Sequence, residues 1–491
     1  MTTMNKNDNR ITLQQIARRA MISRELVPDF PVVELAELKE ITSAATYQSV
    51  QAKDLRHLLW CSVDNDDSLD LDQLTYAEQL PGNKVRVLVA IADVSALVNS
   101  HSNIDHHASL NTTSIYTIAE LFPMLPEKLS TDLTSMRLGV DRCAVVVEMV
   151  VDDDGAVQQS DVYCATVFNW AKLDYESLGA WLEGKGPVPS EVSKVKGLSE
   201  NIQLQDRIAQ KMKELRYEHG ALELETIEAK PVFDGDTLSE MKAELKNRAK
   251  SLIEDFMIAA NGATARFLEG KNFPSLRRVV RTPKRWGRIV ELASEHGFSL
   301  PQKADSKSLS TYLKYIKQND PDHFVDASIN VLKLLGSGEY VVETPGSVSE
   351  GHFGLAVKDY THSTAPNRRY PDLVTQRLLK SAMAGHSIPY SIDQLKQIAY
   401  HCTIKEDDVR KVERQVEKSA AAMLMQSRIG EVFEAIVSGA SPKGTWIRLY
   451  NPHVEGKLVN GFRGLEVGHR LKARLIQIDV EAGFIDFERV E

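Results

Sequence analysis

The sequence predicts an α+β protein, in which a mixed sheet with flanking helices is followed by a C-terminal five-stranded OB-fold barrel. One observation is the near-continuous apolar run VRVLVAIADVSALV at 85–98, typical of a strand buried on both faces. A second is the recurrence of apolar residues at every third or fourth position in 244–270, which predicts one long buried helix. The third is a set of five short alternating segments after Gly430, divided by Gly and Pro, which is the pattern of a small barrel.

The remaining elements follow in order along the chain. Helical spacing in 10–42, broken by two prolines, predicts a short helical region at the start. Strands are expected from LLWCSV at 58–63 onward, helical periodicity returns between 199 and 270, and Gly385 and Gly430 are plausible helix stops. Further strands are predicted at 144–151 and 156–168, and further helices at 368–385 and 410–430. We therefore divide the chain into a helical N-terminal region (1–51), a central domain (52–428) and a barrel (429–491).

The composition is that of an ordinary soluble protein, with 43% apolar and 26% charged residues among 491. No apolar run approaches the roughly 20 residues of a membrane span. The first residues lack the apolar stretch of a secretory signal, so a cytoplasmic protein is expected. The 4 cysteines show no CxxC spacing, which argues against a zinc site and a disulfide framework.

The charge distribution is uneven. The net charge of −9 argues against a general polyanion-binding surface, because nucleic-acid affinity comes largely from Lys and Arg on phosphates. The segment 271–288 nevertheless contains basic residues and no acid, so it could be either a local RNA-binding stretch or a solvated charge run.

The run VDNDDSLDLDQL at 63–74 contains five aspartates. Asp70 and Asp72 are two positions apart and point the same way in an extended segment, and Asp64 can bend back toward them. Three converging carboxylates require a cation, and hard oxygen ligands select Mg²⁺, Mn²⁺ or Ca²⁺. A calcium loop of the EF-hand type fails, because Leu69 and Thr75 occupy the positions of its Gly and Glu. An acidic solvated loop is the alternative.

This run carries a resemblance to the catalytic (RNB) domain of the ribonuclease II and ribonuclease R family of 3′-to-5′ exoribonucleases. The family's acidic motif, an Asp, five residues and then D-x-D-D, matches Asp64, Asp70 and Asp72 with its spacing intact, and Gln73 replaces the fourth Asp. The resemblance covers roughly 52–425 and implies an S1-type OB-fold domain behind it. The resemblance does not extend to the N-terminal cold-shock domains that classical members of the family carry.

Two further motifs resemble those of the family. YTHSTAPNRRYPDL, from Tyr360, matches the arginine motif with Ala365 and Asn367 as departures, and places the family's catalytic arginine on Arg368. IEDFMIAAN matches the family's helix motif and places its substrate-contacting glutamate on Glu254.

The resemblance implies roles for individual residues. The implied catalytic residues are Asp72, Tyr175, Glu254 and Arg368. The implied metal ligands are Asp64, Asp70, Asp72 and Gln73. The implied RNA-binding residues are Tyr116, Tyr175, Glu254, Arg278, Arg368, Arg369, Tyr370 and Glu417, and Glu413 is the alternative to Glu417. Arginine has a planar fork suited to phosphate, and stacking on tyrosine contributes about 1–3 kcal/mol per base. Either tyrosine could instead be ordinary core.

The implied activity is hydrolytic degradation of single-stranded RNA from its 3′ end to 5′-mononucleotides with Mg²⁺, with Mn²⁺ as the alternative ion. Gln73 lowers the charge available to a metal, so a weak or inactive RNA-binding protein is an alternative. A metal-dependent phosphoesterase acting on small molecules is another. RNA affinity is expected to depend on 271–288 and on the barrel, where Phe433, Trp446, Arg448 and Phe462 could contact RNA or be core.

Overall fold

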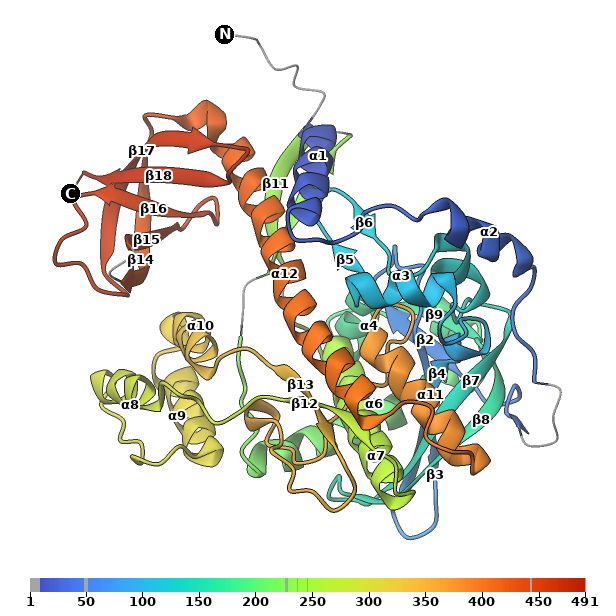
Figure 1. Cartoon of the computed structure of the whole chain (residues 1–491). Coiled ribbons are helices and arrows are strands. Elements are labelled where there is room, and N and C mark those ends of the chain that lie inside the picture. Colours follow the sequence, from blue (N-terminus) through green and yellow to red (C-terminus); the bar gives the residue numbers. More distant parts are fainter. Residues whose placement is uncertain are drawn as a thin grey trace.

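The computed structural model describes residues 9–47, 52–225, 228–235, 237–244, 246–441 and 444–490. Parts of the predicted N-terminal region (1–8 and 48–51) and Leu245 of the predicted helix lie outside the described residues. The described chain forms a sheet domain, a long helix that leads away from it, and a C-terminal barrel (Figure 1). None of the helices among the described residues is long and apolar enough to span a bilayer.

A seven-stranded mixed sheet forms the centre of the first domain, in the order β1-β8-β7-β4-β3-β2-β9. β1 is parallel to β8 and β2 to β9, and the other neighbours are antiparallel. Its strands are β1 (Lys53–Asp54), β2 (Cys61–Asp64), β3 (Gln73–Gln79), β4 (Val85–Ala92), β7 (Asp141–Val151), β8 (Val157–Phe168) and β9 (Ala171–Asp174). Consecutive residues Val87, Leu88 and Val89 are all fully buried, which confirms that β4 is covered on both faces.

Helices α6 (Leu198–Glu218), α7 (Arg248–Gly270) and α11 (Tyr370–Ala384) pack against the sheet. Helix α12 (Ile392–Met425) extends from this domain to the barrel, and α1 (Asn9–Ile22) packs along it (Figure 1). The smaller elements are α2 (Val32–Glu40), α3 (Asn103–Asn111), β5 (Ile115–Tyr116), β6 (Leu121–Phe122), a π-helical turn (Lys128–Leu133), α4 (Tyr175–Leu182) and α5 (Ser190–Ser193).

The barrel is closed by five strands in the order β14-β15-β16-β18-β17, which confirms the predicted OB-type architecture. The strands are β14 (Val432–Ser441), β15 (Gly444–Leu449), β16 (Glu455–Asn460), β17 (Arg470–Asp479) and β18 (Phe484–Arg489). Ala422 and Met425 of α12 are part of the barrel's core, so the connecting helix also closes the barrel.

Two parts of the central domain differ from the prediction. The helical periodicity expected through 199–270 is interrupted by an antiparallel hairpin, β10 (Glu228–Asp234) and β11 (Thr237–Glu244), so α7 begins only at Arg248, after Asn247 caps it. Three helices with their own core lie between β12 (Ser275–Val279) and β13 (Glu339–Glu343), and the sequence did not indicate them: α8 (Trp286–Glu295), α9 (Ser306–Asn319) and α10 (Phe324–Leu335).

The basic segment 271–288 is not a free positive surface. Arg277 is buried and lies 3.0 Å from Glu343, and Arg278 is buried and lies 2.7 Å from Glu406. Arg281 and Arg288 also form ion pairs, with Glu339 and Glu291 among their partners. Acids from distant parts of the chain neutralise this stretch, which the local sequence could not show. Arg277 and Arg278 are therefore internal ion-pair partners, whereas the side chains of Arg281 and Arg288 are about half exposed. RNA binding by this segment stays a prediction.

Candidate active site

The aspartate segment lies where β2 ends and β3 begins. Leu71 is buried in the core, so Asp70 and Asp72 on either side of it turn the other way. The backbone of Leu71 is held on both sides, because its N–H donates to Ser135 Oγ (3.1 Å) and its carbonyl accepts from the N–H of Met136 (2.9 Å). The local fold therefore presents both aspartates on one side of the chain.

Asp72 and Arg368 meet from opposite ends of the sequence, 296 residues apart. The Arg368 Nε donates to Asp72 Oδ2 at 2.7 Å, and the backbone N–H of Asn367 lies 3.3 Å from Asp72 Oδ1. The Asp72 side chain is 4% exposed and that of Arg368 is 41% exposed. Burial raises the pKa of Asp72 to about 7, although Arg368 acts in the opposite direction.

Several contacts hold the loop that carries Arg368. The Arg368 carbonyl accepts from the Ser114 N–H and from the Thr113 hydroxyl, each at 2.9 Å. Asp372, in the first turn of α11, accepts from the Ala365 N–H (2.8 Å) and from Arg369 (2.7 Å). Arg369 thus stabilises this loop through its bond to Asp372.

Tyr116 joins the site through Asp70. Its hydroxyl donates to Asp70 Oδ2 at 2.7 Å, and 45% of the residue is exposed. Its backbone N–H donates to the carboxylate of Glu413 at 3.2 Å, and burial raises the pKa of Glu413. Glu417 lies one turn farther along α12 and is exposed, so the structure brings Glu413 rather than Glu417 to Tyr116.

Tyr175 lies near Asp64 and near the pair of Asp72 and Arg368. Asp174 caps α4, which begins at Tyr175, and Asp174 is paired with Asp64 across β9 and β2. Burial raises the pKa of the Tyr175 hydroxyl, and the charge of Asp64 raises it further. Arg368 and Asp72 also act on this hydroxyl, in opposite directions. The tyrosine therefore lies within electrostatic range of the predicted catalytic groups.

The three carboxylates do not meet at a single point as predicted. The described residues contain no group of three or more His, Cys, Asp or Glu side chains placed to hold a metal ion. Like charges repel, and each carboxylate has its own protein donor: Arg368 for Asp72, Tyr116 for Asp70, and the Asn65 N–H and Ser68 hydroxyl (2.7 and 2.8 Å) for Asp64.

The donor chemistry nevertheless fits a hard divalent cation. All these groups offer carboxylate oxygens, and the buried Asp72, with its raised pKa, is a carboxylate whose charge is incompletely compensated. Gln73 begins β3 opposite Ile91 and is 9% exposed. Within the described part of the chain its amide has no hydrogen-bond partner.

A cavity of about 890 Å³ lies beside Tyr175. Asn247 and Lys250 line this cavity and lie next to Tyr175. Asn247 Nδ2 donates to the Tyr175 carbonyl at 2.7 Å, and the Lys250 ammonium lies 5.8 Å from the centre of the Tyr175 ring. Glu254 also lines the cavity, where it is ion-paired with Lys246. The predicted substrate-contacting glutamate thus faces a space next to the site.

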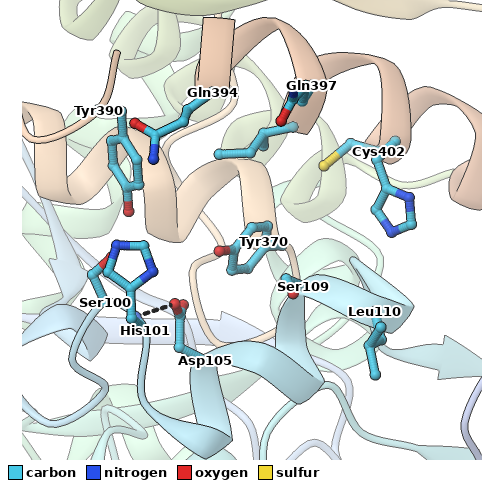
Figure 2. Close-up of a pocket in the computed structure, with 12 residues that line it drawn as sticks. Ser100, His101, Asp105, Ser109, Leu110, Tyr370, Tyr390, Gln394, Gln397 and Cys402 are labelled. Atoms are coloured by element: carbon cyan, nitrogen blue, oxygen red, sulfur yellow. Dashed lines mark hydrogen bonds between the residues drawn. The ribbon is translucent and has the colours of Figure 1, made fainter.

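Two predicted RNA-binding residues lie elsewhere. Arg278 is buried in its ion pair with Glu406 and lies 4.8 Å from the Tyr340 ring. Tyr370 is 6% exposed and lines a different pocket of about 320 Å³, between α3 and the start of α12, where Figure 2 shows it among Asp105, Tyr390 and Cys402. Both side chains are buried in these surroundings, and their contact with RNA stays a prediction.

The barrel residues that were predicted to contact RNA or to be core differ in their exposure. Phe433 is buried against Phe487, with ring centroids 6.4 Å apart, and is therefore core. Arg448 is ion-paired with Asp326 of α10, whereas Phe462 is 43% exposed. Only Phe462 of these three has a side chain open for stacking.

Asn367 and Thr134 are site residues that the sequence reasoning did not identify. Asn367 appeared only as a departure from a motif, and this departure was the available signal. The structure places it fully buried beside Asp72.

Comparisons with known proteins identify the two domains of the chain. The RNB domain matches residues 52–385, and the RNase II-type exonuclease C-terminal S1 domain matches residues 431–490. Ribonuclease R of Thermotoga maritima is 30% identical over 493 residues, which cover 94% of this chain and 68% of the relative. Ribonuclease R 1 of Lactococcus lactis is 27% identical over 501 residues, which cover 95% of this chain and 60% of the relative.

Solved structures show the same likeness. The structure of Mycoplasma genitalium RNase R in complex with ribose methylated single-stranded RNA aligns with a TM-score of 0.88 and 25% identity, over 99% of this chain and 78% of that chain. Among the curated relatives, the share covered falls to 50% for ribonuclease R of Escherichia coli. The chain thus spans about half to three quarters of the length of the curated relatives that it matches. On these matches, the chain belongs to the RNB-domain family and ends in an S1 domain of the RNase II type.

Proposed function

We propose that this protein is a hydrolytic 3′-to-5′ exoribonuclease that removes 5′-mononucleotides from single-stranded RNA with Mg²⁺. The observation that carries the proposal is the contact of Asp72 with Arg368, with Asp70, Tyr116 and Tyr175 around it. We also retain, as part of the proposal, the division into 1–51, 52–428 and 429–491.

The side chains support distinct tasks. Arg368 is partly exposed and can turn its remaining N–H groups to a phosphate whose negative charge grows during attack. Asp72 can orient the attacking water by accepting a hydrogen bond from it, because its carboxylate is fixed beside Arg368.

The aromatic residues and the cavity support recognition of an RNA end. Tyr175 and the exposed Tyr116 can stack on bases without sequence preference. Glu254 can accept a hydrogen bond from a ribose hydroxyl at the price of its ion pair with Lys246. RNA in a relative's structure supports the same class of ligand for this chain.

Asp64, Asp70 and Asp72 would hold Mg²⁺, with Gln73 as a further oxygen donor. The ion would lower the pKa of a bound water and stabilise the leaving oxygen. To bind there it competes with the protein donors that now hold these carboxylates, so we expect activity to depend on the free metal concentration.

The test uses purified protein, single-stranded RNA labelled at its 5′ end, and Mg²⁺ or Mn²⁺. We expect stepwise shortening from the 3′ end and release of 5′-monophosphates, with loss of at least about 10³-fold in D72N. The matched control is D67N, because Asp67 is an exposed aspartate of the same run.

Other outcomes separate the alternatives. RNA binding without shortening would support the inactive RNA-binding protein, and release of nucleoside diphosphates with phosphate would indicate phosphorolysis. Hydrolysis of mononucleotides without any action on RNA would revive the small-molecule phosphoesterase.

A further inference from the structure

A single turn of chain, residues 129–136, touches both halves of the candidate active site. On one side, the Ser135 hydroxyl donates to the Leu69 carbonyl at 2.6 Å, and the Met136 N–H donates to the Leu71 carbonyl at 2.9 Å. Ser135 and Met136 are both fully buried. This side of the turn therefore holds the segment that carries Asp70 and Asp72.

On its other side the same turn holds the arginine loop. The Thr134 hydroxyl donates to Asn367 Oδ1 at 2.6 Å, across 233 residues of sequence, and shares its proton with the Leu129 carbonyl at 2.8 Å within the turn. Thr134 is 5% exposed and Asn367 is fully buried. The Asn367 backbone N–H faces Asp72 Oδ1, and the next residue is Arg368. A displacement of Asn367 would thus move Arg368 relative to Asp72.

Packing alone does not explain why an asparagine occupies position 367, because burying its amide costs free energy. Its Nδ2 is buried without a hydrogen-bond partner among the described residues. A buried donor in this state costs about 1–3 kcal/mol, and a leucine of similar size would avoid that cost. The bond to Thr134 is the benefit that an apolar residue could not supply.

We propose that Thr134 and Asn367 are positioning residues of the nuclease: their hydrogen bond sets where the Arg368 loop lies against the aspartate segment. This inference rests on the proposed function, and neither residue is assigned contact with RNA or metal. Arg368 acts on charge that develops in the transition state, so its misplacement lowers kcat more than it changes KM.

The test is T134V, which removes the hydroxyl and keeps the shape of the side chain. We expect kcat on single-stranded RNA to fall by about 10- to 100-fold, the usual cost of a small misplacement, with KM changed less than about threefold. T134S keeps the hydroxyl and should restore kcat to within about threefold of wild type. The matched control is T131V on the same turn, whose hydroxyl bonds only to the Glu127 carbonyl, at 2.9 Å, and which should leave kcat unchanged.

N367L tests the other partner. If both residues act through one bond, T134V/N367L should be no slower than the slower single variant. Equal losses in T134V and T131V, or multiplicative losses in the double variant, would overturn the inference.

A crystal structure of T134V gives a readout that does not depend on turnover. The inference expects the Arg368 Nε to leave its 2.7 Å bond with Asp72. A structure in which this bond is retained would overturn the inference even if the wild type degrades RNA. Conversely, a wild type that releases no nucleotide would refute the proposed function, while the displacement of Arg368 in T134V would still be observed.

Discussion

The carboxylate of Asp72 is buried, whereas the guanidinium that compensates it is 41% exposed. This asymmetry means that Arg368 can contact a ligand from solvent without leaving Asp72. It also explains why the pKa of Asp72 stays high, because one partly solvated cation offsets only part of the desolvation of a buried acid.

We predict that R368K lowers kcat by about 10²- to 10³-fold, as does the loss of one preorganised donor in other active sites. Lysine keeps the charge but cannot bond Asp72 and a phosphate through one planar fork. Single-turnover kinetics on a short single-stranded RNA would measure the effect. R56K is the control, because Arg56 is an exposed arginine that pairs with Asp54 and Asp141 outside the predicted site. Equal rates in R368K and wild type would exclude arginine-specific recognition.

Gln73 is the fourth predicted metal ligand but supplies no charge to a metal. We predict that Q73D lowers the Mg²⁺ concentration for half-maximal activity by roughly tenfold, because a charged ligand contributes about 1.5 kcal/mol more than a neutral one. A metal titration of RNA hydrolysis would show the shift. Q79D adds the same charge at the far end of β3 and should cause no shift. A decrease in activity at all metal concentrations would contradict the idea that the site is under-charged.

Helix α2 is attached to α3 through a buried pair of titratable groups. Glu34 Oε2 lies 3.1 Å from His107 Nδ1, and their side chains are 4% and 2% exposed. Burial raises the pKa of Glu34 to about 7 and lowers that of His107 to about 4. Both groups are therefore neutral at pH 5 to 6.

Each member of this pair makes stability depend on pH. The folded-state pKa of Glu34 is raised, so its contribution is fully present below pH 4.5 and is lost as the pH rises through about 7. Each unit corresponds to about 1.4 kcal/mol, so Glu34 alone loses about 3 kcal/mol. The lowered pKa of His107 acts in the opposite direction, because stability is regained as the pH rises from about 4 to 6.5. The two effects largely cancel between pH 5 and pH 8 in the wild type. We therefore predict that E34Q, in which only His107 titrates, is about 2 kcal/mol more stable at pH 8 than at pH 5, and urea unfolding at the two pH values would measure it. E40Q alters an exposed glutamate of the same helix and should follow the wild type.

Long-range contacts connect the barrel to the rest of the protein. Arg448 pairs with Asp326 of α10, Arg19 of α1 pairs with Glu481 at 2.7 Å, and the end of α12 lies in the barrel core. The barrel is therefore fixed against α1, α10 and the end of α12 (Figure 1).

We predict that removal of 430–491 weakens binding of single-stranded RNA, because stacking groups such as Phe462 are lost and each contributes about 1–3 kcal/mol. Anisotropy titrations in the D72N background would measure affinity without cleavage. Truncation exposes Met425, so F462A provides a second, folded variant, and we expect it to weaken binding about fivefold or more. Unchanged affinity in both variants would remove the barrel from RNA recognition.

Local pattern was sufficient for much of this architecture. β4 is buried on both faces and leaves a continuous apolar run in the sequence. Helix α7 and the barrel strands are buried on one side and leave a helical or an alternating period. The helices α8 to α10 were missed because a small separate core leaves only short, weak periods. The hairpin of β10 and β11 was missed for the same reason, since its segments are too short to outweigh the helical pattern around them.

The sequence by itself determined the family and the identity of Asp72, Arg368, Tyr116 and Tyr175 as candidates, because the spacing of a motif is a local property. Only the tertiary structure decided which neighbours share the site. It buried Arg278 and Tyr370, brought Glu413 to Tyr116, and joined Thr134 to Asn367. The physical reason is that hydrogen bonds and ion pairs between residues hundreds of positions apart depend on how strands and helices meet, and no local pattern records that meeting.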